Sequence, residues 1–222
     1  MPRLIDLSHV IVSGATAYPG LPGPEIDDYL TFDESHAHYA AGTEFRIGRL
    51  SMVGNTGTYL DTPAHRYRDG YDLSELRLEQ VVDLPGVRVP VSSRRIPPEI
   101  LKDIDLNGKA VLFQTGWSRH WRTSRYGDPD HPFILSETAE LLVTRGAALV
   151  GIDSVNIDDT SAESRGSRPA HSALLRWEVP LVEHLCNIEA IGDHAFTFSA
   201  VPVRVENLAT FPVRAYAHLR ES

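Results

Sequence analysis

The sequence contains a single cysteine, Cys186, so no disulfide can form within the chain. It also lacks any apolar run near the roughly 20 residues that cross a bilayer. Its first residues, MPRLIDLSHVIV, show neither the apolar core nor the small-residue cleavage site of a secretory signal. We therefore expect a fold that does not depend on an oxidising compartment, a cytoplasmic location and no membrane partner.

Positive charge is scarce, because 21 Lys and Arg residues stand against 30 Asp and Glu residues and leave a formal net charge of −9. No stripe of Lys and Arg is present that would follow a nucleic-acid backbone, so no nucleic-acid partner is predicted. Glycine-rich phosphate-binding motifs are missing, and no nucleotide cofactor is predicted. The absence of a Gly-x-Ser-x-Gly turn argues against a serine hydrolase of the α/β class.

What the sequence does contain is an alternation of strand and helix signals. Continuous apolar runs at 110–114 and 148–153 predict strands that are buried on both faces. Segment 136–145 predicts a helix that Ser136 caps and Gly146 ends. Weaker signals predict a second helix at 169–177 and further strands at 4–12, 45–53, 181–185, 195–205 and 212–218. This order predicts an α/β fold with one domain over residues 1–222.

Four other segments are harder to interpret. Near-helical apolar spacing predicts a helix at 72–82, whereas two prolines in 84–91 favour a strand at the edge of a sheet. Segments 13–44 and 118–132 show no regular pattern and predict long loops. Their aromatic side chains suit a planar ligand, or packing beneath a loop.

The densest group of reactive side chains lies in residues 55–65, which read NTGTYLDTPAH. If the chain is extended here, Tyr59 and Asp61 point to the same side and His65 follows within one turn. A phenol, a carboxylate and an imidazole could then meet in one cavity. The same residues could instead serve turns, with Asp61 as a turn cap and His65 as a hydrogen-bonded loop histidine.

Residues 55–65 resemble the motif His-x-Gly-Thr-His-x-Asp-x-Pro-x-His of the cyclase family of hydrolases, which includes bacterial kynurenine formamidases and isatin hydrolases. Asn55 and Tyr59 stand where the family has its two leading histidines. Similar segments continue from about residue 4 to about residue 217: DLSH at 6–9, YPG at 18–20, TGW at 115–117, HSALL at 171–175 and PLVE at 180–183. The resemblance implies the cyclase-family fold, a mixed sheet with a barrel-like core and surrounding helices of the swivelling β/β/α type.

The resemblance also implies a metal site. In two-metal relatives the two motif histidines and the aspartate hold one ion, and the aspartate, a later histidine and a later glutamate hold the second. Asp61, His171 and Glu183 match this second set and could hold one divalent ion, Zn or Mn, with an open position for water. The loss of two imidazoles, at Asn55 and Tyr59, weakens metal binding, so a metal-free site is the alternative.

For activity, the resemblance places His65 at the position of the family's proton-transfer histidine, beside Asp61. It implies hydrolysis of an amide, formamide or lactam C–N bond in a small aromatic substrate. The residues that the resemblance and their aromatic or amide character assign to substrate binding are Tyr18, Asn55 and Trp117. Because relatives assemble, a homodimer or a higher homo-oligomer is expected.

The same residues allow two other functions. Without a metal, His65, Tyr59 and Asp61 suit the chemistry of a lyase, a dehydratase or a cyclase in a biosynthetic pathway. The third alternative is a catalytically inactive relative that binds a ligand. Arg165 and Arg168, in a polar run after the second buried strand, could meet an anionic substrate or simply face solvent.

Overall fold

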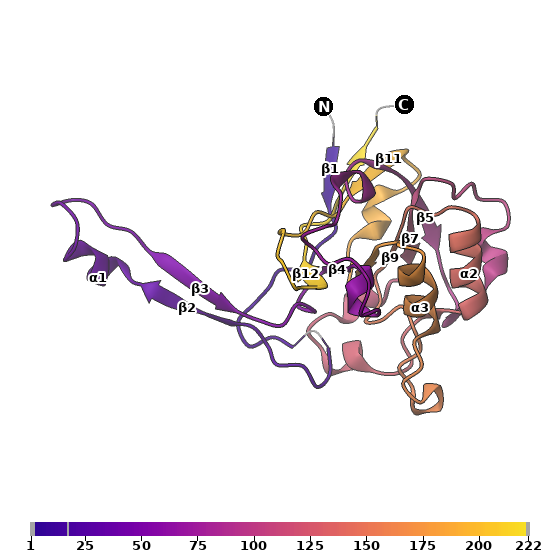
Figure 1. The fold of residues 1–222 in the computed structure, drawn as a ribbon, viewed down its shortest axis with the longest axis horizontal. Helices are drawn as coiled ribbons and strands as arrows, with labels where there is room; N and C mark the ends of the chain where they lie inside the picture. The colour runs from indigo at the N-terminus through magenta and orange to yellow at the C-terminus, as the bar shows by residue number, and fades with distance from the viewer. Residues whose placement is uncertain (1–2, 17, 221–222) are drawn as a thin grey trace.

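The computed structural model describes residues 3–16 and 18–220 and shows a mixed α/β domain (Figure 1). A curled nine-stranded sheet forms a half-barrel, which confirms the expected fold class. In spatial order its strands are β1 (Arg3–Asp6), β13 (Tyr216–Leu219), β11 (Phe196–Ser199), β5 (Leu84–Pro90), β7 (Ala110–Gln114), β9 (Leu149–Ile152), β10 (Leu181–Glu183), β4 (Tyr59–Asp61) and β12 (Thr210–Pro212). The central strands β5, β7, β9 and β10 run parallel, and the flanking pairs are antiparallel.

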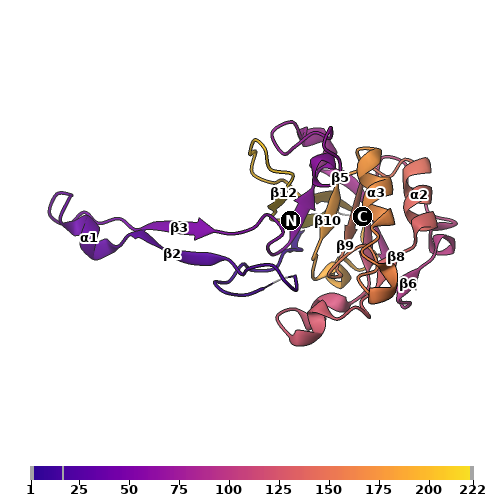
Figure 2. The ribbon, with the colours of Figure 1, turned by 60° about the horizontal axis from the view of Figure 1, so that its bottom comes forward.

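Two helices cover one face of the parallel strands, α2 (Ser136–Thr144) and α3 (Pro169–Arg176), which lie side by side in Figures 1 and 2. Ala139 and Leu142 of α2 and Leu174 of α3 share an apolar cluster with Val111 and Val150 of the sheet. A second buried cluster contains residues from β7, β10, β11 and β13. Each fully buried Leu or Val contributes about 1.5–3 kcal/mol, so burial on both faces explains the uninterrupted apolar runs.

Shorter elements connect these layers. A small parallel pair is formed by β6 (Arg95–Ile96) and β8 (Phe133–Ile134). The 3₁₀ turns are η1 (Pro63–His65), η2 (Leu78–Gln80), η3 (Pro98–Leu101), η4 (Trp117–His120), η5 (Ser124–Gly127), η6 (Ala162–Ser164) and η7 (Ile188–Ile191). Within residues 3–16 and 18–220, no helix is both long and apolar enough to cross a membrane.

The predictions for the buried strands and for the helices at 136–145 and 169–177 are confirmed by β7, β9, α2 and α3. One detail at the start of α2 is wrong. Ser136 is not the N-cap residue, because Leu135 occupies that position and Ser136 is the first helical residue. The Ser136 hydroxyl donates a hydrogen bond to the Glu137 carboxylate. Gly146 does end the helix, with a φ of 75° that favours glycine.

Two predictions about residues 72–91 are wrong. Segment 72–82 contains only the turn η2, because Asp72 accepts hydrogen bonds from the backbone of Ser74 and of the distant Asn207, which hold its neighbourhood in a turn. Strand β5 lies inside the sheet, between β7 and β11, and not at its edge. Its two prolines are tolerated because Pro85 and Pro90 lie at the ends of the strand.

Residues 13–44 are more regular than predicted. Strand β2 (Glu25–Leu30) pairs with β3 (Ile47–Ser51) in a hairpin. A short helix, α1 (Phe32–His36), follows β2 at the far end of this hairpin. A capping box between Thr31 and Glu34 begins α1. Figures 1 and 2 show that residues 25–51, which we call the arm, protrude from the body of the protein. The strand predicted at 45–53 is thus confirmed, but all of β3 is exposed.

Segment 118–132, also predicted as irregular, contains the turn η5 and the end of η4.

Candidate active site

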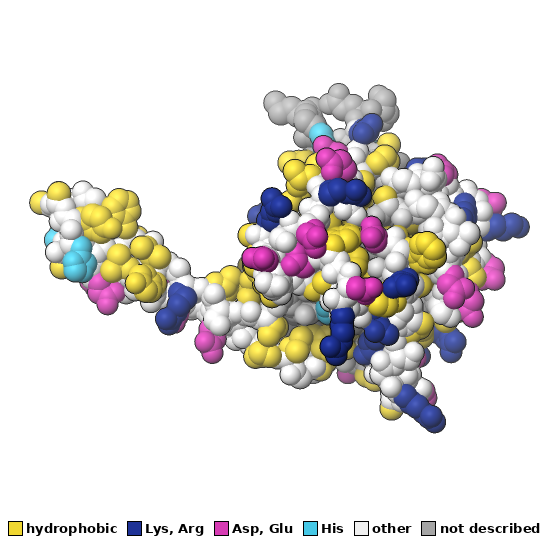
Figure 3. Space-filling model, viewed as in Figure 1, with side chains coloured by type: hydrophobic (Ala, Val, Ile, Leu, Met, Phe, Trp, Pro, Cys, Tyr) yellow, Lys and Arg dark blue, Asp and Glu magenta, His cyan; other side chains and the backbone are white. Residues whose placement is uncertain are grey.

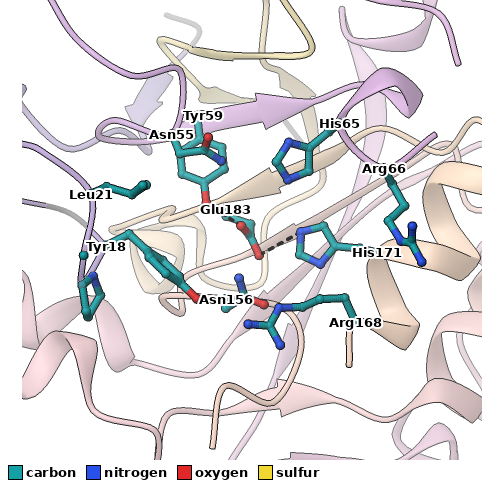
Figure 4. A pocket seen from close by; sticks show the side chains of 12 residues that line it. Tyr18, Leu21, Asn55, Tyr59, His65, Arg66, Asn156, Arg168, His171 and Glu183 are labelled. Atoms are coloured by element: carbon teal, nitrogen blue, oxygen red, sulfur yellow. Dashed lines mark hydrogen bonds and ion pairs between the residues drawn. The ribbon is translucent and has the colours of Figure 1, made fainter. Parts of the chain in front are cut away.

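A cavity of about 380 Å³ opens where β4, β10 and the start of α3 meet (Figure 4). The antiparallel pairing of β4 with β10 places Tyr59 opposite Glu183 and Asp61 opposite Leu181. This register joins the early motif to the late segment. The side chains that line the cavity include Tyr18, Leu21, Asn55, Tyr59, His65, Arg66, Asn156, Arg168, His171 and Glu183.

Asp61 is fully buried next to this lining. Its Oδ1 accepts a hydrogen bond from the Thr210 hydroxyl on β12, whereas its Oδ2 has no hydrogen-bond partner among the described residues. The Nε2 of His171 lies 3.9 Å from that Oδ2 and 3.8 Å from Oε1 of Glu183. A buried carboxylate oxygen without a partner is costly, so this position calls for a cation or a proton donor.

Asp158 fixes the orientation of His171. Its carboxylate accepts the backbone N–H groups of Ala170 and His171, and its Oδ2 lies 2.7 Å from Nδ1 of His171. The ring therefore donates its Nδ1 proton to Asp158 and turns Nε2 towards Asp61 and Glu183. A carboxylate in this position holds many metal-binding or proton-transferring histidines. Sequence reasoning missed Asp158 because it lies in a polar run. The only signal was the general rule that a functional histidine is often oriented by a carboxylate.

Charge and burial act against each other on His171 and Glu183. Burial disfavours the imidazolium, but Glu183, the hydrogen bond to Asp158 and the charge of Asp61 outweigh it and raise the pKa of His171 to about 9. Burial raises the pKa of Glu183 to about 7, although His171 opposes this shift. In the absence of another cation, the pair holds a proton in the middle of the site.

Tyr59 is a neutral donor. Its hydroxyl lies 2.6 Å from Oε2 of Glu183, whose Oε1 accepts the backbone N–H of Ile157 at 2.7 Å. Burial, with the charges of Glu183 and Asp61, raises the pKa of Tyr59 well above its usual value. The phenol therefore keeps its proton and fixes the Glu183 carboxylate; it cannot replace the missing histidine as an anionic metal ligand.

His65 stands at the opening of the site, where Pro63 begins the turn η1. Its side chain is 34% exposed, and its Nδ1 lies 3.0 Å from the Thr210 hydroxyl and 3.6 Å from Oδ1 of Asp61. Because Thr210 donates its proton to Asp61, it can only accept from Nδ1–H of His65. In the neutral ring, Nε2 is then the unprotonated atom, as a general base requires.

The residues fit a divalent cation. Asp61, His65 and His171 each offer one ligand atom, and these atoms all lie within 4.8 Å of one another. The set expected from the sequence contained Glu183 in place of His65, and both Glu183 oxygens already accept hydrogen bonds. The unpartnered oxygen of Asp61 and the oriented Nε2 of His171 belong to both sets, so these two residues form the centre of the candidate site.

The residues expected to bind substrate divide into two groups. Tyr18 and Asn55 line the cavity. Trp117 does not; it is buried in a separate cluster with Tyr126 and Val155, and its indole N–H donates to the Tyr126 carbonyl. Tyr18 packs against this cluster, and the role of Trp117 in substrate binding stays a prediction. The cavity lining also contains Arg66, Arg168 and Asn156. Sequence reasoning had assigned Arg66 and Asn156 no role, and it left Arg168 open between an anion contact and solvent.

A half-barrel sheet with a buried carboxylate and two histidines beside one cavity defines an α/β domain with a candidate metal centre. The family model described as putative cyclase matches residues 5–159 of the chain. The protein therefore belongs to the cyclase family.

Curated relatives extend this similarity beyond the matched region. The chain is 26% identical over 213 residues to a kynurenine formamidase of Bacillus cytotoxicus, and the match covers 95% of both chains. It is 24% identical over 209 residues to a kynurenine formamidase of Erythrobacter litoralis, with 91% of this chain and 88% of the relative covered.

Solved structures show the same fold. Isatin hydrolase A from Labrenzia aggregata superposes with a TM-score of 0.84 at 21% identity, covering 99% of this chain and 94% of that one. A potential metal-dependent hydrolase with cyclase activity gives a TM-score of 0.79 at 22% identity, and the match covers 100% of both chains.

Proposed function

We propose that the protein hydrolyses an amide-type C–N bond, a formamide or a lactam, in a small aromatic substrate. The curated relatives are kynurenine formamidases, and isatin hydrolases share the fold. One observation in this chain carries the proposal. The unpartnered oxygen of Asp61, the oriented Nε2 of His171 and the accessible ring of His65 face one another beside a cavity.

A single divalent ion, Zn or Mn, fits this chemistry. Asp61 and His171 would hold the ion and Glu183 would complete the set, which leaves His65 free for proton transfer. Such an ion supplies Lewis acidity for a carbonyl group and lowers the pKa of water. Asp158 keeps Nε2 of His171 available by accepting the proton on the other ring nitrogen.

His65 is the proposed proton-transfer residue. Its Nε2 takes a proton from the attacking water and returns it to the leaving nitrogen. The hydrogen bonds that connect His65 to Thr210 and Thr210 to Asp61 orient the His65 ring. Asn55 and Tyr18 lie on the cavity wall, where the amide can bind the substrate carbonyl and the phenol ring can pack on an aromatic substrate.

The test is hydrolysis of formanilide by the purified protein, with metal content measured in parallel. We expect turnover that a chelator abolishes and that Zn or Mn restores. Metal-loaded protein that hydrolyses neither a formamide nor a lactam would contradict the proposal. Full activity after complete metal removal would favour the metal-free alternative, in which His65, Tyr59 and Asp61 carry out elimination or ring closure.

We also propose that the chain works as a homo-oligomer that assembles through the arm. An isolated two-stranded hairpin is marginally stable. Yet the arm exposes a row of large apolar side chains that a second copy of the chain would bury (Figure 3). They are Ile26, Tyr29, Phe32, Tyr39, Phe45, Ile47 and Leu50.

Sedimentation equilibrium tests this assembly. Tyr29→Glu should shift the protein to monomer, because Tyr29 is 71% exposed on the arm and its replacement puts a charge into the proposed contact. Leu78→Glu is the matched control, since Leu78 is 60% exposed on the body of the protein. A monomeric wild-type protein would contradict the proposal.

A further inference from the structure

We propose that the opening of the active-site cavity binds a carboxylate group of the substrate through Arg66 and Arg168. The inference rests on the proposed hydrolase function and narrows its substrate class to aromatic amides that carry an anionic group. Both arginines line the cavity together with His65 and His171.

Arg66 follows His65 directly, and Nε of its guanidinium donates to the Ser172 hydroxyl at 3.1 Å. Its Cζ lies 5.4 Å from the centre of the Tyr67 ring. Both contacts are neutral, so they position the side chain without compensating its charge. The remaining guanidinium N–H groups are free to bind an anion.

Arg168 precedes Pro169 at the start of α3 and is half-buried. Its guanidinium donates to the carbonyl groups of Asp159 and Ser167, at 3.1 and 2.8 Å. The carboxylate of Asp159, whose carbonyl Arg168 contacts, pairs instead with Arg94 at 3.0 Å. Arg168 thus also keeps an uncompensated positive charge at the cavity.

Arg66 and Arg168 are two of 19 arginines, most of which make no ion pair with a carboxylate within the described residues. Six arginines make ion pairs with carboxylates within the described residues, namely Arg46, Arg49, Arg88, Arg94, Arg125 and Arg214. Neither Arg66 nor Arg168 has a carboxylate within 4.0 Å in residues 3–16 and 18–220, although the protein carries a net charge of −9. What distinguishes Arg66 and Arg168 is their place: both guanidinium groups line the same cavity without a carboxylate partner, which favours an anionic ligand there.

The positions of the lining residues indicate how a substrate would be oriented in the cavity. Figure 4 shows Arg66 and Arg168 flanking His171, across the cavity from Tyr18 and Leu21. Arg66 and Arg168 put positive charge at the opening of the cavity, so the anionic end of a substrate would bind there. An aromatic ring would then lie along Tyr18 and Leu21, and the C–N bond would face His65 and His171.

The experiment compares 2-formamidobenzoate with formanilide, which has the same ring and formamide but no carboxylate. Wild-type protein should prefer the carboxylate substrate by roughly 10-fold or more in kcat/KM. In Arg66→Gln and in Arg168→Gln this preference should fall about 10-fold, mainly through a higher KM for the charged substrate. Arg165→Gln is the control, because Arg165 is exposed, lies three residues from Arg168 and does not line the cavity.

A binding measurement separates this inference from the proposed activity. Titration calorimetry with benzoate should give an affinity that each of the two variants weakens and that the control leaves unchanged. If no amide is hydrolysed but benzoate binding follows this pattern, the proposed function fails and the carboxylate site stands. Equal preference for both substrates in the wild type, or an equal loss on both in the variants, overturns the inference.

Discussion

A buried histidine lies on each side of Tyr59, and the two histidines have different surroundings. On the cavity side, His171 is buried among carboxylates: Nδ1 contacts Asp158, and Nε2 lies 3.9 and 3.8 Å from Asp61 and Glu183. On the other side, His184 is equally buried, but neither of its ring nitrogens has a hydrogen-bond partner among the described residues. Its neighbours are the rings of Tyr59, Tyr126 and Trp121, with centroids 5.0, 5.4 and 5.7 Å away.

The consequence is a difference in charge. Burial lowers the pKa of His184 to about 3, whereas the carboxylates around His171 reverse the effect of burial and raise its pKa to about 9. Burial of a histidine is therefore no sign of function in this fold. The carboxylates decide which imidazole can hold a proton or a cation, and which one only packs.

Removing the central carboxylate should produce the largest change. Asp61→Asn keeps the shape of the side chain but removes the charge that faces His171 and the candidate cation site. We expect turnover to fall roughly 10³-fold or more, since an ion contributes several kcal/mol to this kind of reaction. Steady-state kinetics and metal content should fall together. Normal metal content with normal turnover would place the chemistry elsewhere.

His65 should affect turnover but not metal content. His65→Gln removes the proposed base, for which we expect a loss of roughly 10²–10⁴-fold in kcat. The bound metal should remain stoichiometric, because Glu183 is proposed to complete the ligand set; loss of the metal would place His65 among the ligands instead. His38→Gln, at an exposed histidine on the arm, is the control and should match the wild type. Unchanged kcat in His65→Gln would rule out its proposed role.

Asp158→Asn tests whether the carboxylate acts through His171. It leaves the pocket lining intact but weakens the contact that fixes the tautomer of the ring, so we expect roughly 10–100-fold lower activity or metal affinity. Asp153→Asn is a matched control, because Asp153 is equally buried and also accepts three hydrogen bonds, from Thr115 and Gly116. If both variants lose the same activity and the same stability, Asp158 is only structural.

The parts of the fold that could be predicted from the sequence are those with a local signal. Strands β7 and β9 are buried on both faces, and each therefore appears as a continuous apolar run. The predicted helix at 72–82 failed because distant contacts decide that segment: Leu73 is buried, and its backbone N–H donates to the carbonyl of Leu208. Strand β2 has no buried face, so no alternation of apolar residues marked it.

The candidate site was predictable only in part, because some of its contacts join residues that are far apart in the sequence. The motif resemblance identified Asp61, His65, His171 and Glu183, and the structure brings them around one cavity. Thr210 links His65 to Asp61 but is 149 residues away from Asp61 in sequence. No spacing pattern encodes such a contact, because sheet pairing between β4 and β12 creates it.

The aromatic side of Tyr59 offers the last and smallest test, at His9, which belongs to the same cluster as His184. The His9 ring stacks on Trp121 with centroids 3.9 Å apart, and its buried Nε2 has no hydrogen-bond partner among the described residues. Burial lowers the pKa of His9 to about 4. In the unfolded chain its pKa returns to the ordinary value of about 6.5. Between these values the unfolded state takes up a proton that the folded state refuses, so stability falls as the pH drops from about 6.5 to 4.

His9→Gln removes this titration. Because His9 is only partly buried, we expect the variant to lose about 1–2 kcal/mol less stability than the wild type between pH 7 and pH 4. Urea unfolding at several pH values measures the difference, with His38→Gln as an exposed control that should keep the wild-type slope. Parallel pH profiles for wild type and His9→Gln would show that the folded protein accommodates a charged His9. Within the aromatic cluster beside Tyr59, His184 would then be the histidine whose protonation burial opposes, in contrast to His171 among its carboxylates.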